Sequence, residues 1–176
     1  QINELRSVMD EFFFHQLPRY GFDVLRQVRV IGGERKAEAI RGIMKEKGKP
    51  LSDAIAVGDS ITDYKMLKLV KEHGGLSVVF NGNEYAVPYA TVGLASVDIS
   101  PLIMLCDAFV QGGKARVKEV VKTWSSADFE GNLKSRKEPL PYFHDIESAD
   151  DSEMEAIIRV HKQIRTEVRA QAGRLG

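Results

Sequence analysis

The stretch that decides the fold is Ala54-Ile55-Ala56-Val57-Gly58-Asp59-Ser60-Ile61-Thr62-Asp63. Its first four residues are all apolar, and a strand without polar alternation is typical of one that is covered on both faces. The apolar run stops at Gly58, and a helical spacing of apolar residues begins at Ile61. A buried strand that leads directly into a helix predicts one step of a parallel sheet with crossover helices.

The sequence on both sides of this stretch repeats the same rhythm. Helices are predicted over residues 34–47 and from 61 to about 73, and further buried strands over 76–80 and 91–95. We therefore predict an α/β fold, a three-layer Rossmann-type parallel sheet of which this chain supplies about three strands. The core is expected to span residues 1–124.

Both ends of the chain are predicted to be helical. A helix over residues 2–15 is expected to end at Pro18. Residues 125–150 are interpreted as a linker, and residues 151–176 as a helical extension that opens with a capping box of Ser152 and Glu155. The apolar stripe of this extension includes His161 as a packing residue. It must pack on its own domain or on a second copy of the chain, and the sequence leaves both open.

Composition excludes several classes of protein. The 176 residues include 43% hydrophobic ones, and 25 basic side chains balance 25 acidic ones, which is not the composition of a disordered chain. The longest stretch without a charge is 13 residues, too short to span a membrane. No basic stripe is present that would bind nucleic acid. The lone Cys106 favours a reducing compartment, and we expect a cytoplasmic protein.

Two acids and a lysine form the candidate site. Asp59 follows a buried strand, so it is expected at the carboxyl edge of the sheet, where ligands of open α/β folds bind. Asp63 lies four residues further on, in the first turn of the next helix. Two carboxylates beside a helix N-terminus suit Mg²⁺ together with a phosphate. Spacing alone also allows a turn residue and a helix-start acid.

Lys36 strengthens the case for a metal and phosphate site. It follows Gly32-Gly33 at the start of a predicted helix, one step earlier along the sheet. From there it can point at the same edge and neutralise both carboxylates and a phosphoryl oxygen. A solvated first-turn lysine is the alternative for Lys36 taken alone.

These segments together resemble a known family. Gly32-Gly33-Glu34-Arg35-Lys36 followed by Val57-Gly58-Asp59-Ser60-Ile61-Thr62-Asp63 is similar to motifs III and IV of the haloacid dehalogenase (HAD) superfamily of phosphohydrolases. The segment Val79-Phe80-Asn81-Gly82-Asn83-Glu84-Tyr85-Ala86 resembles the one that follows the next core strand in an archaeal branch of that superfamily. The likeness to this branch extends over most of the chain.

The resemblance implies a role for each site residue. Lys36 would be the catalytic lysine that stabilises the phosphoryl group. Asp59 would bind Mg²⁺ directly, and Asp63 directly or through water. Asn81 and Asn83 would rim the mouth of the site and contact a small phosphorylated substrate.

One part of the family's machinery is missing from the sequence. Enzymes of the superfamily attack phosphate with the first Asp of an Asp-x-Asp pair that ends their first strand, and no such pair follows a strand here. The chain therefore resembles the carboxyl-terminal half of a HAD protein, expected to be inactive alone. Its expected partner is the missing amino-terminal half or a second copy. The alternative is a non-catalytic HAD-like module that serves assembly or regulation.

A second resemblance is weaker. Gly58-Asp59-Ser60-Ile61-Thr62 is also similar to the first block of SGNH (GDSL-type) esterases, in which Ser60 would be the nucleophile. Such enzymes also need a Gly-x-Asn-Asp block and an Asp-x-x-His block, and the sequence contains neither. Without a base, Ser60 is interpreted as an ordinary hydroxyl.

Overall fold

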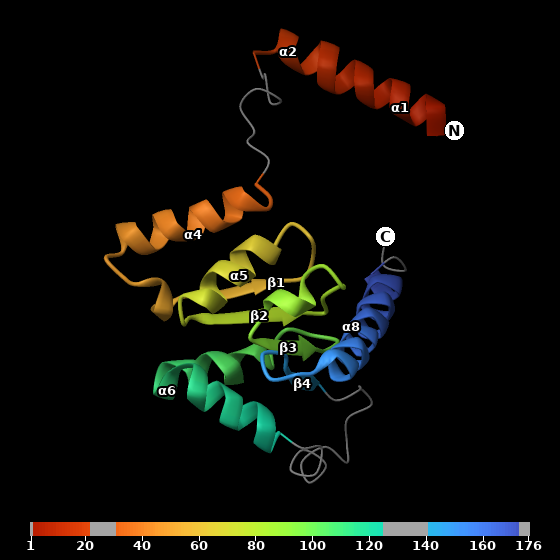
Figure 1. Cartoon of the computed structure of the whole chain (residues 1–176). Helices are drawn as coiled ribbons and strands as arrows, with labels where there is room; N and C mark the ends of the chain where they lie inside the picture. Colours follow the sequence, from red (N-terminus) through yellow and green to blue (C-terminus); the bar gives the residue numbers. More distant parts are fainter. Residues whose placement is uncertain (1, 22–30, 125–140, 173–176) are drawn as a thin grey trace. The chain divides into compact units, whose positions relative to one another are not determined.

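The computed structural model describes residues 2–21, 31–124 and 141–172. The chain divides into two compact units, residues 1–31 and residues 32–176 (Figure 1). In the part of the chain that is described, no helix combines the length and the apolar character needed to cross a membrane.

The smaller unit is helical throughout its described part. Helix α1 (Ile2–Asp10) continues into a π-helical segment η1 (Glu11–Gln16) and a last turn α2 (Leu17–Arg19). The helix predicted over residues 2–15 is therefore present. Pro18 does not end it, because a proline is tolerated in the first turn of α2. None of the side chains of α1, η1 and α2 is buried.

The larger unit is built on a four-stranded sheet. Its strands are β1 (Ile55–Gly58), β2 (Leu76–Phe80), β3 (Val92–Ala95) and β4 (Tyr142–Asp145), in the order β1-β2-β3-β4. The first three strands are parallel, as predicted. The fourth is antiparallel to β3, with Gly93 opposite His144. Strand β4 lies in the stretch that was interpreted as a linker, and residues 125–140 of that stretch lie outside the described residues.

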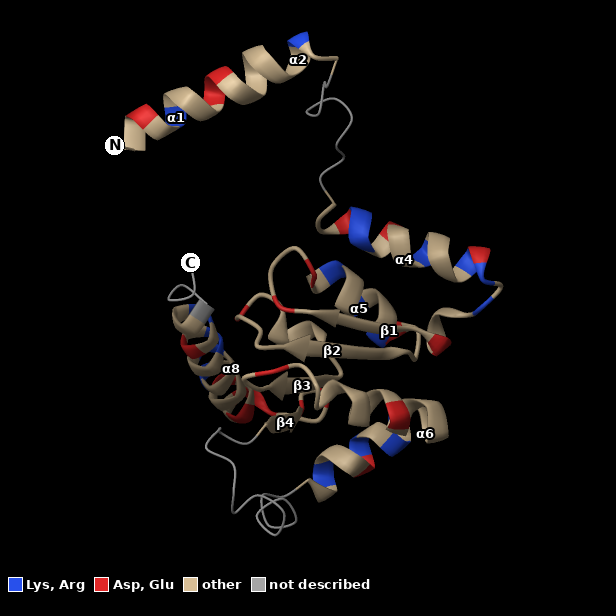
Figure 2. Cartoon of the chain, turned by 180° about the vertical axis from the view of Figure 1, so that it is seen from behind, with Lys and Arg blue, Asp and Glu red and all other residues tan. Residues whose placement is uncertain are grey.

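Helices cover both faces of this sheet (Figure 1). They are α4 (Glu34–Glu46), α5 (Tyr64–Glu72), α6 (Leu102–Thr123) and α8 (Asp151–Ala172), with short 3-10 turns η2 (Leu51–Asp53) and η3 (Val87–Tyr89). Val79 packs with α5 and α8, whereas its neighbour Val78 packs with α6 on the opposite face. This alternation gives the three layers that the sequence predicted. Figure 2 shows that β1, β2 and β3 carry no charged residue.

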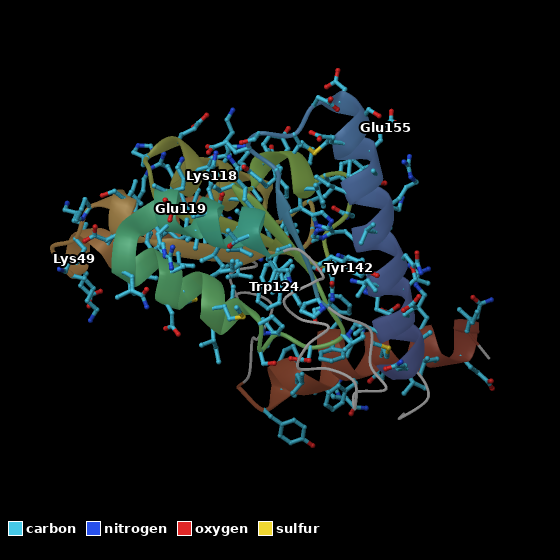
Figure 3. The ribbon with its side chains drawn as sticks, turned by 90° about the horizontal axis from the view of Figure 1, so that it is seen from below. Lys49, Lys118, Glu119, Trp124, Tyr142 and Glu155 are labelled. Carbon is cyan, nitrogen blue, oxygen red and sulfur yellow. The ribbon has the colours of Figure 1, made fainter. Side chains whose placement is uncertain are left out.

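Helix α6 is interrupted at a pair of glycines. Gly112 and Gly113 leave the helical conformation, and Gly113 has a φ of 63°, which a glycine adopts without strain. Figure 3 labels Trp124, at the end of α6, and Tyr142, at the start of β4. The ring of Trp124 meets that of Phe143 on β4 at 4.8 Å between centroids. This contact ties the helix to the antiparallel edge strand.

Helix α8 begins with a different capping box from the predicted one. The side chain of Asp150 accepts a hydrogen bond from the Glu153 N–H at 2.8 Å, and that of Glu153 accepts one from the Asp150 N–H at 3.0 Å. The predicted pair, Ser152 and Glu155, lies two residues further along, inside the helix. Both pairs have the same spacing, and the one that precedes the first helical turn forms the cap.

The apolar stripe of α8 packs on its own unit. Ile157 belongs to the core cluster on the α5 face, and Ile164 is 4% exposed. His161 is fully buried, and its Nε2 lies so close to Gly93 on β3 that a Cβ there would be 2.7 Å away. Its Nδ1 accepts a hydrogen bond from the Gly82 N–H at 3.1 Å. His161 is thus a packing residue, as predicted, and it anchors α8 beside β3.

Candidate functional site

The site lies where β1 ends, in the loop of residues 59–63. The buried Asp63 closes this loop, because its Oδ2 accepts hydrogen bonds from the N–H groups of Asp59 and Ser60, both at 3.1 Å, and from the Ser60 hydroxyl at 3.0 Å. Gly58 makes room for it. A Cβ on residue 58 would lie 2.5 Å from the Cβ of Asp63, closer than real Cβ contacts come. The glycine and the acid of this motif therefore fit each other sterically.

Lys36 reaches the other oxygen of the same carboxylate. Its Nζ lies 2.5 Å from Asp63 Oδ1. The start of α4 is placed by Gly33, whose N–H donates to the Thr62 carbonyl at 2.8 Å. The structure thus brings Lys36 and Asp63 together, as predicted. Lys36 was also expected to neutralise Asp59, but in the described part of the chain Asp59 forms its ion pairs with Arg165 and Arg169.

The pKa of Asp63 reflects these partners. Burial raises its pKa, but the hydrogen bonds from Lys36, from the Asp59 N–H and from Ser60 outweigh burial, so the net pKa lies below the ordinary value. Both oxygens of Asp63 are engaged by protein donors. Asp63 therefore holds the loop and the Lys36 side chain in place.

Asp59 presents the more accessible carboxylate of the two. Its side chain is 45% exposed, and its Oδ2 lies 2.8 Å from Nη1 of Arg165 and 3.8 Å from a nitrogen of Arg169. The same Nη1 donates hydrogen bonds to the carbonyls of Asp59 at 2.8 Å and of Asn81 at 3.0 Å. Arg165 belongs to α8, so the terminal helix contributes a cation to this site.

Sequence reasoning did not single out Arg165. One signal could have found it, because Arg165 follows the inward-facing His161 by four residues, and residues with that spacing share a helix face. Figure 2 shows basic residues along α8 and acidic ones in the loops beside the sheet.

Asn81 joins the site through its main chain. Its carbonyl holds Arg165, whereas its side-chain amide is engaged by Ser96: Nδ2 donates to the Ser96 carbonyl at 2.7 Å, and Oδ1 accepts from the Ser96 N–H at 2.9 Å. This clamp ties the ends of β2 and β3 together. Asn81 has a φ of 46°, a left-handed conformation that Asn adopts more readily than most residues.

Asn83 also lies beside Asp59. Its N–H donates to the Asp59 carbonyl at 3.1 Å, and its side-chain Oδ1 accepts from the Tyr85 N–H at 3.2 Å. Both asparagines are therefore at the carboxyl edge of the sheet, next to Asp59. Contact of their side chains with a substrate stays a prediction.

The side chains of the site suit a Mg²⁺ ion that is bound directly by one carboxylate. Within the described ranges no group of three or more His, Cys, Asp or Glu side chains gathers around a point that could hold a metal ion. Asp59 offers a hard, accessible oxygen, and Mg²⁺ in proteins is commonly held by one or two carboxylates while it keeps several waters. Asp59 would hold the ion, and Asp63 would support it through the loop.

Ser60 is built into the loop. Its hydroxyl donates to Asp63 and shares a hydrogen bond of 3.2 Å with the Thr62 hydroxyl. Neither partner is a histidine that could act as the base of an esterase. The geometry therefore favours the interpretation of Ser60 as a loop hydroxyl.

Comparison with known proteins agrees with the site. Residues 30–98, which include Lys36, Asp59 and Asp63, match the haloacid dehalogenase-like hydrolase family. The structure is similar to that of gene product AF1437 from Archaeoglobus fulgidus, with a TM-score of 0.64 and 29% identity over 97% of this chain and 48% of that one. This chain thus spans about half the length of that relative. No curated protein matches the sequence. The motifs, the fold and these matches support membership of the haloacid dehalogenase superfamily.

Proposed function

We propose that the chain is the carboxyl-terminal half of a Mg²⁺-dependent HAD-type phosphohydrolase of the archaeal branch, which acts on a small phosphorylated metabolite. The observation that carries this proposal is the Lys36–Asp63 ion pair beside the accessible Asp59, all three at the carboxyl ends of the parallel strands. Mg²⁺ at Asp59 would supply positive charge for a phosphoryl group. A cytoplasmic location is part of the proposal, supported by the lone cysteine.

Each residue has a defined task in this proposal. Asp59 binds the cation, and Asp63 fixes the loop that presents Asp59. Lys36, oriented by Asp63, donates hydrogen bonds to the phosphoryl oxygens and stabilises the charge that develops on them. The attacking carboxylate, which would become an aspartyl-phosphate, is supplied by a segment outside the 176 residues.

The sheet offers a place for that segment. Among the described residues β1 pairs with β2 only, and no described strand lies along its other edge. A strand that adds to this edge in parallel would bring its carboxyl end next to Asp59. The amino-terminal half of a longer protein or a second polypeptide could supply it. This partner is part of the proposal.

Hydrolysis of p-nitrophenyl phosphate tests the proposal. The 176-residue chain should show no turnover above background with Mg²⁺, because it lacks the attacking Asp. A longer polypeptide that includes an Asp-x-Asp pair at the end of a strand should be active, and Lys36→Met or Asp59→Asn should abolish its activity. Lys47→Met is the matched control, since Lys47 is an exposed lysine next to the end of the same helix. Turnover by the short chain that survives Asp59→Ala would contradict the proposal.

One observation favours the alternative of a non-catalytic module. Asp63 is neutralised by Lys36 and Asp59 by Arg165, so the acids of the site have protein cations as partners. Such a site can stay folded without a metal and serve assembly or regulation. A longer polypeptide that binds no Mg²⁺ and hydrolyses no phosphate ester would support this alternative.

A further inference from the structure

Helix α8 places a cation directly against the candidate metal ligand. In Figure 1, α8 stands beside the ends of the strands and the loop between β1 and α5. Three of its basic residues face this edge with helical spacing: Lys162 pairs with Glu84 at 3.3 Å, and Arg165 and Arg169 pair with Asp59. Arg165 is the most buried of the three, with a side chain 15% exposed.

Arg165 is held in this position independently of the Asp59 carboxylate. Its two hydrogen bonds go to main-chain carbonyls at the ends of two neighbouring strands, those of Asp59 and Asn81. One turn earlier, His161 fixes the helix through the Gly82 N–H. The guanidinium is therefore a fixed charge, 2.8 Å from Asp59 Oδ2.

We propose that Arg165 competes with a divalent cation for the carboxylate of Asp59, so that α8 sets the metal affinity of the site. The proposal rests on the proposed role of Asp59 as metal ligand. Arg165 and a divalent cation at the same oxygen would repel each other, and the repulsion is strong in a partly buried site. Metal binding then requires Asp59 or Arg165 to turn away. This part of α8 lies beyond residues 30–98, the segment that matches the family.

Titration with Mg²⁺ and Mn²⁺, followed by the amide resonances of the loop after β1, tests this competition. Arg165→Met should bind the metal about tenfold more tightly than the wild type, since a unit charge is removed at contact distance. Arg165→Lys keeps the charge and should stay within about twofold of the wild type. Arg159→Met is the matched control, because Arg159 is an exposed arginine on α8 that pairs with Glu155. Arg159→Met should leave the metal affinity unchanged.

A second measurement does not depend on the folding of a variant. In the wild type, the side-chain N–H resonances of Arg165 should shift with the same midpoint as the loop resonances when Mg²⁺ is added. The competition would be overturned if the wild type and Arg165→Met bound the metal equally tightly. It would also be overturned if the loop resonances responded to Mg²⁺ and those of Arg165 did not. Either result would leave the metal site intact. Binding in neither protein would overturn both the competition and the metal site of the proposed function.

Discussion

Lys36 Nζ lies 2.5 Å from Asp63 Oδ1, although the two residues are 27 positions apart in the sequence. Asp63 takes three further hydrogen bonds from its own loop, so this carboxylate joins the start of α4 to the end of β1. Two segments of the family motif are thereby held in one arrangement.

Asp63→Asn should destabilise the larger unit by about 1–3 kcal/mol, because Lys36 and the donors of the loop lose a charged acceptor. Urea unfolding measures this. Asp53→Asn is the control, since Asp53 is an exposed acid before β1, and should change the stability little.

The lowered pKa of Asp63 also predicts how the stability of the wild type depends on pH. Its stabilisation is present above the ordinary Asp pKa and is lost as the pH falls through the lowered one, and the variant should lack this loss. An Asp63→Asn variant as stable as the wild type would show that the loop does not depend on this carboxylate.

Gly58→Ala should also destabilise the chain, by about 1–3 kcal/mol, since its Cβ would lie 2.5 Å from the Cβ of Asp63 and force the loop to move. Gly42→Ala is the matched control. Gly42 lies inside α4 with nothing within 4 Å of an added Cβ, so alanine there should stabilise the helix by up to about 1 kcal/mol. Thermal unfolding of both variants measures the contrast. Equal effects at the two positions would contradict the steric account of Gly58.

Acid should weaken the packing of α8 through two buried histidines. Burial lowers the pKa of His161 to about 3, with a smaller contribution from nearby His144, and burial lowers that of His144 to about 4. Both pKa values lie below the unfolded value near 6.5. As the pH falls below about 6.5, only the unfolded chain binds these protons. Each histidine then lowers the free energy of unfolding by about 1.4 kcal/mol per pH unit until its folded pKa is reached.

Unfolding free energies between about pH 7 and about pH 5 measure this loss. His161→Gln keeps an acceptor for the Gly82 N–H and removes one titrating group, so its stability should fall less steeply with acid. If the unfolding free energy of His161→Gln fell with pH as steeply as that of the wild type, His161 would not be the titrating group that its burial predicts.

The part of the fold that follows from local sequence was predictable. Residues 55–57 are apolar and end at Gly58, residues 76–80 are apolar except for Ser77, and the structure forms β1 and β2 there. Asp59 and Asp63 follow β1 directly and Lys36 lies at the start of α4, so their meeting at one edge could be inferred from topology.

The rest depends on contacts that no local pattern encodes. Strand β4 is Tyr142–Asp145, with two polar residues and a mixed burial pattern, and it forms because it pairs with β3. Arg165 meets the Asp59 carbonyl across 106 positions of sequence. Its place in the site is set by how α8 packs on the sheet, which the sequence left open.

The proposed role of Asp59 as metal ligand is tested most directly by a Mn²⁺ titration of the chain and of Asp59→Asn. Paramagnetic broadening of amide resonances follows the titration. We predict a weak, roughly millimolar site, since Asp59 is the one carboxylate of the pair with an accessible oxygen and Mg²⁺-like ions give up water reluctantly. Resonances of Ser60 and Asn83 should broaden first in the wild type and not in Asp59→Asn, whereas the exposed control Asp53→Asn should behave as the wild type. Broadening at the same residues and the same Mn²⁺ concentration in Asp59→Asn would contradict the account.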